Sequence, residues 1–269
     1  MKKLVLSLIL VFLLIMFLRL FVYSQANVCI KSEGVWYENT CLTENTSQKQ
    51  LMQLGLIQEE KTDKTDIKVT YPYQVTEYPE IFEYLRNKSK EIKKDNGFDE
   101  ENIDLGLSGH PWSLNIDMST FAETADLASI IGYVFSFTGG AHPNHSYFSV
   151  NFIKDSEKRI GLNDLFENQK EALSSISEFT IADILKQKSD RLNEKIAEDE
   201  WLDEGAGPDI KNYSIFEFVP GKGDKAEAIK FIFPPYQVGP YVEGVYEVQV
   251  PAAVFGEYLN NNFKDSFIN

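Results

Sequence analysis

Two histidines separated by two residues form the chain's strongest candidate for bond-breaking chemistry. They are His142 and His145, within the segment FTGGAHPNHSYFSVNF that runs from Phe137 to Phe152. A zinc ion held by such a pair and a carboxylate could polarise an amide and activate a water molecule. This hypothesis predicts a metal-assisted amidase or deacetylase that acts on the cell wall. The sequence has no H-E-x-x-H motif, which would place zinc ligands and a general base on one helix.

The residues around the histidine pair favour a structural interpretation instead. The Gly139–Gly140 pair permits the positive φ angles that a tight turn needs. The Pro143–Asn144 pair is typical of turns, and aromatic residues that favour strands lie on both sides. We therefore expect a hairpin connection and assign no catalytic residue, no metal and no cofactor. Metal binding by His142 and His145 stays the alternative.

A proline-rich segment with two tyrosines is the best candidate for binding. It reads FPPYQVGPYVEG, from Phe233 to Gly244, and contains Tyr236 and Tyr241. Proline reduces the conformational freedom of a loop, so these tyrosines are held in place before a partner arrives. Ordered aromatic side chains are frequent anchors of protein interfaces. The alternative is that both tyrosines only cover the edge of a sheet, since aromatic residues are ordinary core material.

The charge of the chain indicates what kind of partner it can attract. The N-terminal 26 residues hold three basic and no acidic residues, which leaves 23 basic and 41 acidic residues and a net charge of −18. Such a surface repels nucleic acid and anionic lipid and steers cationic partners. Five acids in the segment 198–209 are the candidate steering charges: Glu198, Asp199, Glu200, Asp203 and Glu204. Acidity that only keeps the protein soluble is the alternative.

The N-terminus directs the chain out of the cytoplasm. Lys2 and Lys3 precede an apolar run from Leu4 to Leu18, and Ser24-Gln25-Ala26 has the small residues that signal peptidase requires. We expect export with cleavage after Ala26, to a periplasmic or extracellular location. The alternative is an uncleaved segment that anchors the protein in the inner membrane.

The two cysteines of the chain, Cys29 and Cys41, follow this segment directly. An even number of cysteines in an exported chain favours a disulfide. The bond would close a short ring with a structural role and no redox chemistry, because the chain has no Cys-x-x-Cys motif.

The hydrophobic patterns predict an α+β fold in which antiparallel sheets carry helices on one face. Pro72 indicates that the first strand lies at a sheet edge. A polar linker with a short helix is expected before it, over residues 43–66. The remaining elements are strands at 67–75, 112–124, 127–139, 145–153, 213–219, 228–233 and 245–251, and helices at 78–94, within 160–196 and at 253–263.

Three strings occur in a familiar order: FTGGAHPNHSYFSVNF, GLNDLF and FPPYQVGPYVEG. In order and spacing the chain resembles the paired domain in the extracellular part of RsiV-type anti-sigma factors. The same pair occurs beside the catalytic domain of PdaC-type peptidoglycan deacetylases. The resemblance covers about Asp66 to Phe263, with residues 66–152 similar to the deacetylase-associated module and 153–263 similar to the C-terminal module. It implies an exported α+β domain and, as in RsiV-type members, lysozyme binding.

The chain also departs from these relatives. Only three residues precede the apolar segment, so we expect no anti-sigma domain. The Thr-Phe-Asp-Asp and His-Ser-x-x-His motifs of the deacetylases are missing, so deacetylase activity is not carried over.

The sequence therefore predicts an exported, non-catalytic binding protein of this accessory-domain type, whose partner is a lysozyme-like cationic protein or peptidoglycan. A structural envelope domain without a small ligand is a further alternative to the metal-assisted hydrolase. The expected organisation is a signal peptide or anchor at 1–26, a disulfide ring and linker at 27–65, and two modules at 66–152 and 153–263.

Overall fold

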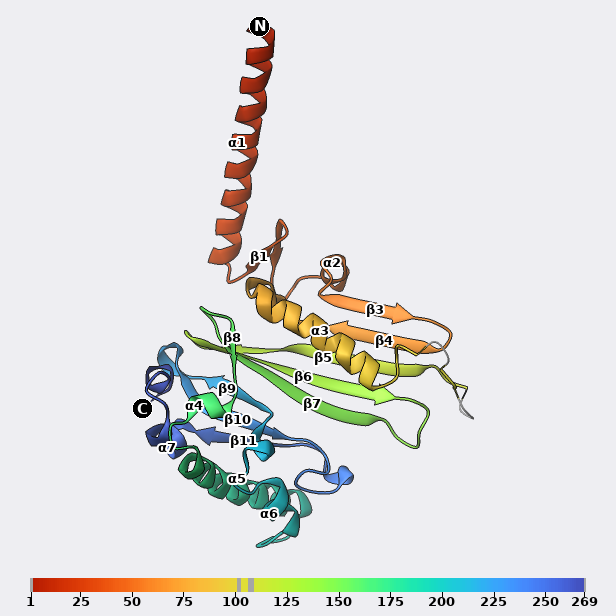
Figure 1. Ribbon diagram of the computed structural model, residues 1–269, viewed down its shortest axis with the longest axis vertical. Helices are drawn as coiled ribbons and strands as arrows, with labels where there is room; N and C mark the ends of the chain where they lie inside the picture. Colours follow the sequence, from red (N-terminus) through yellow and green to blue (C-terminus); the bar gives the residue numbers. More distant parts are fainter. Residues whose placement is uncertain (1, 101–102, 106–108, 269) are drawn as a thin grey trace.

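The protein consists of a long N-terminal helix and an α+β body, seen in a computed structural model that describes residues 2–100, 103–105 and 109–268 (Figure 1). Helix α1 (Lys2–Lys31) stands away from the body. Among the described residues, the stretch Val11–Lys31 is one helical segment long and apolar enough to cross a membrane, with a mean hydropathy of 1.7. Large apolar side chains at 11–16, 18 and 20–23 are exposed, as expected of a helix that inserts into a membrane.

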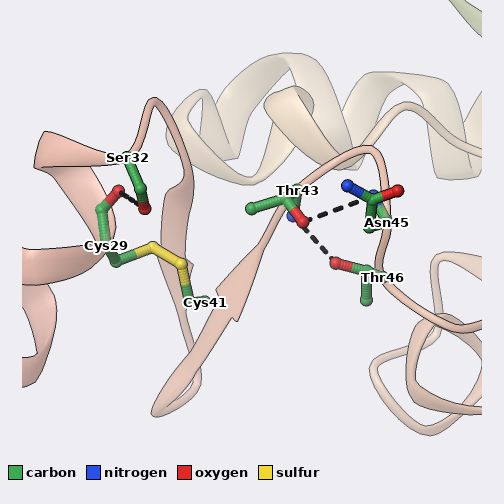
Figure 2. Close-up of a disulfide and its surroundings, with 6 residues drawn as sticks. All are labelled: Cys29, Ser32, Cys41, Thr43, Asn45 and Thr46. Atoms are coloured by element: carbon green, nitrogen blue, oxygen red, sulfur yellow. Dashed lines mark hydrogen bonds between the residues drawn. A yellow bond between two sulfur atoms is a disulfide. The ribbon is translucent and has the colours of Figure 1, made fainter.

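The predicted disulfide joins the end of α1 to a small hairpin, formed by β1 (Val35–Tyr37) and β2 (Thr40–Leu42). Cys29 lies in the last turns of α1 and bonds to Cys41 of β2, as Figure 2 shows. The hydroxyl of Ser32 donates to the Cys29 carbonyl at 2.8 Å and helps to end the helix. The hairpin packs on the body through Val35 and Leu42, which belong to its core. The helix is therefore attached to the body by both the chain and a covalent cross-link.

Residues 43–66, expected as a polar linker with a short helix, are part of the body. Ser47 caps helix α2 (Gln48–Gln53) in a reciprocal arrangement with Gln50. Strand β3 (Ile57–Lys61) follows and forms the edge of the large sheet. The segment IQEEK shows no alternation, because the side chains on both faces of β3 are exposed from Gln58 to Lys61. The expected short helix is thus present as α2, whereas the residues after it form a sheet strand instead of a linker.

The large sheet has six strands in the order β3-β4-β5-β6-β7-β8. Strands β4 and β5 are parallel and the other pairs are antiparallel, so the sheet is mixed. Strand β4 was expected at an edge, but it lies between β3 and β5, because Pro72 falls after the strand has ended. The predicted meander is present as β5, β6 and β7. The remaining bounds are β4 (Thr65–Thr70), β5 (Trp112–Glu123), β6 (Leu127–Phe137), β7 (Asn144–Ile153) and β8 (Lys158–Ile160).

Helix α3 (Pro79–Asp95) covers one face of the large sheet, as expected from its helical spacing. The 3-10 turn η1 (Tyr73–Glu77) leads into it, and Pro79 occupies its first turn. Ile81, Phe82 and Leu85 are buried against the alternating apolar residues of β4 and β5. Gly97, at φ +75°, follows the end of the helix.

The second half of the chain forms a three-stranded antiparallel sheet in the order β11-β10-β9, with α5 on its outer face (Figure 1). Apolar residues at alternate positions of its strands pack against α5 and α7 in a second core. The bounds are α4 (Leu162–Leu165), α5 (Gln169–Leu192), α6 (Glu200–Gly205), η3 (Ile210–Tyr213), β9 (Phe216–Pro220), η4 (Lys222–Asp224), β10 (Ala226–Phe233), η5 (Tyr241–Glu243), β11 (Tyr246–Pro251), α7 (Ala252–Phe255), η6 (Gly256–Tyr258) and η7 (Lys264–Ser266).

The free edge of β9 is bonded to side chains of the large sheet. The Phe218 N–H donates to the hydroxyl of Ser129 at 2.9 Å, and the Asn151 amide donates to the Phe216 carbonyl at 3.0 Å. Ser149 accepts from the Phe216 N–H at 3.2 Å. These groups replace a neighbouring strand, so the edge is not left with unpaired backbone groups. They also explain why polar side chains are buried in β6 and β7.

Candidate binding surface

The histidine pair lies at a hairpin, as the flanking residues predict. Strands β6 and β7 pair in antiparallel register up to Ser136 and Asn144, and the intervening residues form the connection. Gly139 adopts φ +86°, which favours glycine. His142 lies exposed in the connection, whereas His145 is already part of β7 and sits opposite Phe135.

His145 is embedded among aromatic residues of the large sheet. Its Nδ1 lies 2.5 Å from the hydroxyl of Tyr133, and its ring stacks on that of Tyr133 at 5.7 Å between centroids. The ring of Phe135 contacts it edge-on at 5.5 Å, and Tyr147 packs beside Tyr133 at 5.1 Å. The side chain therefore has a packing role and one occupied ring nitrogen.

The two predicted anchor tyrosines reach the same place from the other module. The ring of Tyr241 lies 5.0 Å from that of His142 and 6.0 Å from that of His145. Tyr236 lies 5.6 Å from Tyr241. We refer to Tyr133, Phe135, His142, His145, Tyr147, Tyr236 and Tyr241 as the aromatic cluster. It joins β6 and β7 to the connection between β10 and β11.

The proline-rich connection is ordered by its own backbone. The Tyr236 N–H donates to the Gly239 carbonyl at 3.0 Å, and the Gln237 N–H donates to the Pro234 carbonyl at 3.1 Å. Tyr236 is held at φ +73°, a left-handed conformation that is unfavourable for a residue with a Cβ. Its side chain is nevertheless 57% exposed. A strained backbone that presents an exposed ring is typical of a binding surface.

A buried lysine ties this connection to the rest of the second module. Lys188 of α5 is 2% exposed, and its Nζ lies 2.7 Å from Asp199 and 2.9 Å from Glu243. The hydroxyl of Tyr246 donates to the same Glu243 carboxylate at 2.7 Å. Arg191 donates to the Glu243 and Val245 carbonyls. Since Glu243 ends the turn that carries Tyr241, Lys188 holds that tyrosine in place.

The phenols of Tyr133 and Tyr147 stay protonated over the physiological range, because the pKa of each is raised. Burial raises the pKa of Tyr133, and the neighbouring Tyr241 raises it further. Burial also raises the pKa of Tyr147, with added contributions from Tyr133 and from the carboxylate of Glu247. Tyr133 and Tyr147 thus offer neutral phenol rings with hydroxyl groups.

The five candidate acids fall into different environments. Asp199 pairs with Lys188 and accepts from the Trp201 N–H at 2.9 Å, so it is a structural residue that caps α6. Glu200 and Glu204 line a pocket of about 560 Å³ together with Trp201 and Tyr236. Glu198 and Asp203 are exposed outside that lining. The structure therefore brings two of the five acids next to one of the two anchor tyrosines.

No group of three or more histidine, cysteine, aspartate or glutamate side chains is positioned for a metal within the described ranges. The Nδ1 of His142 lies 2.9 Å from the Pro143 carbonyl, while that of His145 faces Tyr133. The metal hypothesis for His142 and His145 remains a prediction that zinc analysis of the purified protein would test.

Several residues of the surface were not recognised in the sequence. Tyr133 and Tyr147 were counted only as strand residues, although alternation places them on the face that also carries His145. Lys188 gives no signal, because a lysine in a helix is usually exposed. Trp201 lies in the acidic segment 198–209, where no helix was expected, whereas residues 200–205 form α6.

These features define an α+β protein with an apolar N-terminal helix and an exposed aromatic surface beside an acidic pocket. Residues 163–253 match the family model described as "Protein of unknown function (DUF3298)". That segment contains Lys188, α6 and both anchor tyrosines, and the histidine pair precedes it.

Two solved structures are similar to the chain. A DUF3298 family protein from Pseudomonas aeruginosa has a TM-score of 0.49 at 15% identity, covering 77% of this chain and 93% of its own. A member of the same family from Bacteroides fragilis has a TM-score of 0.46 at 17% identity, covering 77% and 92%. No curated protein matches the chain.

Proposed function

We propose that this chain is an exported, non-catalytic binding protein that recognises a cationic protein through the pocket beside Tyr236. The supporting observation is the composition of that pocket, where the rings of Trp201 and Tyr236 stand next to the carboxylates of Glu200 and Glu204. The one lysine in the pocket lining, Lys211, is paired with Asp209 at 3.2 Å. An arginine or lysine side chain gains from both, through cation–π contact and ion pairing. The net charge of the exported part adds long-range attraction.

The resemblance to RsiV-type proteins suggests the class of partner. In those proteins the corresponding domain binds lysozyme, which is a cationic protein in many organisms. The match of residues 163–253 to DUF3298 is consistent with this and carries no function by itself. The alternative partner from the sequence, peptidoglycan, would not need the acidic pocket. The pocket therefore favours the protein partner at this position.

Calorimetric titration with a cationic lysozyme tests the proposal, with the full chain held in lipid nanodiscs. We expect binding that weakens as salt concentration rises, because screening reduces attraction between exposed charges. The double variant Glu200→Gln/Glu204→Gln should lose most of the affinity and of the salt dependence. Asp203→Asn is the matched control, since Asp203 lies on the same short helix outside the pocket lining. Absence of binding at low salt would contradict the proposal for this partner.

We also propose that the N-terminal segment is retained as a membrane anchor. Helix α1 continues without interruption past Ala26 to Lys31, and the disulfide at Cys29 fixes its end to the body. Signal peptidase acts on an extended segment, whereas Ser24 to Ala26 are helical here. The mass of the protein purified from membranes should therefore include the first 26 residues. A soluble product that begins at Asn27 would show that the segment is a cleaved signal peptide.

A further inference from the structure

The two faces of the large sheet differ in character. The face under α3 carries alternating aliphatic residues such as Val69, Ile116 and Val134, all buried. The opposite face is covered by β9 near one end of the strands, through the bonds to Ser129 and Asn151. Toward the β6–β7 hairpin, the same face carries polar and aromatic side chains that are only partly buried.

The strand register arranges these side chains in rows across four strands. Polar residues stand on β4 and β5, and aromatic residues stand beside them on β6 and β7. One row consists of Lys68, Asn115, Phe135 and His145, and the next consists of Thr70, Asp117, Tyr133 and Tyr147.

The polar half of this face is hollowed. A pocket of about 430 Å³ is lined by side chains from β4 and β5, including Asp66, Lys68, Asn115 and Asp117, with Phe135 on its aromatic side. Lys68 bonds to Glu59 and Asp66 bonds to Lys61, so these charges are held in place by pairs on the rim. The pocket thus combines fixed donors and acceptors with a ring.

Recognition on this face depends on side chains alone. Strands β4, β5 and β6 have a neighbour on each side, so their backbone groups are used in the ladder and an added peptide strand has nothing to pair with. What remains are rings flanked by amide, carboxylate and ammonium groups. A sugar ring matches such a surface, because its C–H face packs on an aromatic ring while its hydroxyls bond to the polar groups.

We propose that this sheet face is a binding site for a neutral glycan chain. Charge decides between classes of glycan. The lining charges Asp66 and Lys68 are paired with Lys61 and Glu59, so Asp117 leaves the pocket with a net negative charge that disfavours a polyanion such as a uronic acid polymer. A chain of neutral hexopyranose units can span the rows from the pocket to His145 and Tyr147 on β7. The site uses residues other than those of the Tyr236 pocket, so it goes beyond the proposed protein partner.

The test is a titration of the full chain in nanodiscs with chitohexaose and with cellohexaose, using hexagalacturonate as the anionic counter-probe. Nanodiscs are preferred because glycoside detergents would compete for the site. We expect at least one neutral hexasaccharide to bind and the anionic one to fail. Absence of binding by both neutral probes at millimolar concentration, or equal binding of the anionic probe, would overturn the proposal.

Two variants locate the site. Phe135→Leu keeps an apolar side chain but removes the ring, and Asn115→Ala removes a donor and an acceptor. Each should weaken glycan binding about fivefold or more, as expected for one stacking contact or one hydrogen bond. Trp201→Leu is the matched control and should leave glycan affinity unchanged, because Trp201 lies at the other pocket.

The same variants separate the two proposals. Asn115→Ala should leave lysozyme binding intact, whereas Glu200→Gln/Glu204→Gln should leave glycan binding intact. If chitohexaose or cellohexaose binds but neither Phe135→Leu nor Asn115→Ala weakens it, the sugar sits elsewhere and the assignment to this face is wrong. Circular dichroism of each variant ensures that a loss of affinity is not a loss of fold.

Discussion

Lys188 shows how one buried charge can order an exposed loop. It bridges Asp199, which begins α6, and Glu243, which follows Tyr241. Helix α6 and the connection that carries Tyr236 both line the Tyr236 pocket. Both are therefore held by a residue of α5 that is itself buried. Gly239 fits this arrangement, because a Cβ there would lie 2.5 Å from Glu243 Oε2 and 3.0 Å from Lys188 Nζ.

Replacement of Lys188 by methionine should destabilise the protein strongly. The change leaves two mostly buried carboxylates without their cation, and loss of one partner of a buried pair costs about 3 kcal/mol or more. Urea denaturation of Lys188→Met and of Lys186→Met measures the effect, since Lys186 is exposed on the same helix. Equal stability of the two variants would show that the lysine contributes no more than a surface charge.

The raised pKa of Glu77 predicts how the stability of the protein depends on pH. Burial raises the pKa of its carboxyl above the ordinary value of 4.5, and the charge of Glu123 raises it further, against the opposite effect of Lys154. The folded state thus favours protonated Glu77. The stabilisation from protonation is complete below the unfolded pKa and is lost as pH rises through the folded pKa.

The variant Glu77→Gln should therefore be more stable than the parent at pH 7 and no more stable near pH 4. Thermal unfolding at the two pH values gives the comparison directly, with the difference between variant and parent as the measured quantity. A difference that is the same at both pH values would mean that the carboxyl of Glu77 is not perturbed in the folded state.

At the scale of elements, the sequence predicted the helices and strands that bury one face and expose the other. The helix expected at 78–94 is α3 (Pro79–Asp95), and the strands of the meander lie within a few residues of their expected positions. Burial of alternate or helically spaced residues is a local property, so a local pattern reveals it. Strand β3 was missed because its side chains are nearly all exposed.

The site could be predicted only in part. The two tyrosines were singled out from their proline-rich segment. The contact of Tyr241 with His142 and His145 joins segments nearly a hundred residues apart, and it depends on how the two sheets meet. The hydrogen bonds between β9 and the side chains of Ser129, Ser149 and Asn151 set that arrangement. Serine and asparagine inside a strand pattern carry no sequence signal for such a partner.

Ser129 provides a test of this junction. Ser129→Ala removes the acceptor for the Phe218 N–H, and a buried donor without a partner costs about 1–3 kcal/mol. Ser119→Ala, at an exposed position of β5, is the control. In chemical denaturation, the free energy of unfolding of Ser129→Ala should be lower than that of the parent and that of the control. A neutral effect would indicate that the edge of β9 is satisfied in another way.

For the whole molecule, the same junction decides whether the modules at 66–152 and 153–263 can act separately. Strand β8 (Lys158–Ile160) belongs to the large sheet although it lies in the second segment, and β9 depends on side chains of β6 and β7. The aromatic cluster likewise needs both halves. We therefore expect the body to unfold as one cooperative unit.

Native-state hydrogen exchange at increasing denaturant measures this cooperativity. Peptides from β6 and from β10 should reach the same opening free energy, because neither core persists once the junction is broken. The β1–β2 hairpin should exchange at lower free energy, since it packs at the margin of the core and is held by a single disulfide. If β9–β11 opened well before β5–β7, the modules would be separable, and the aromatic cluster would form only when they dock.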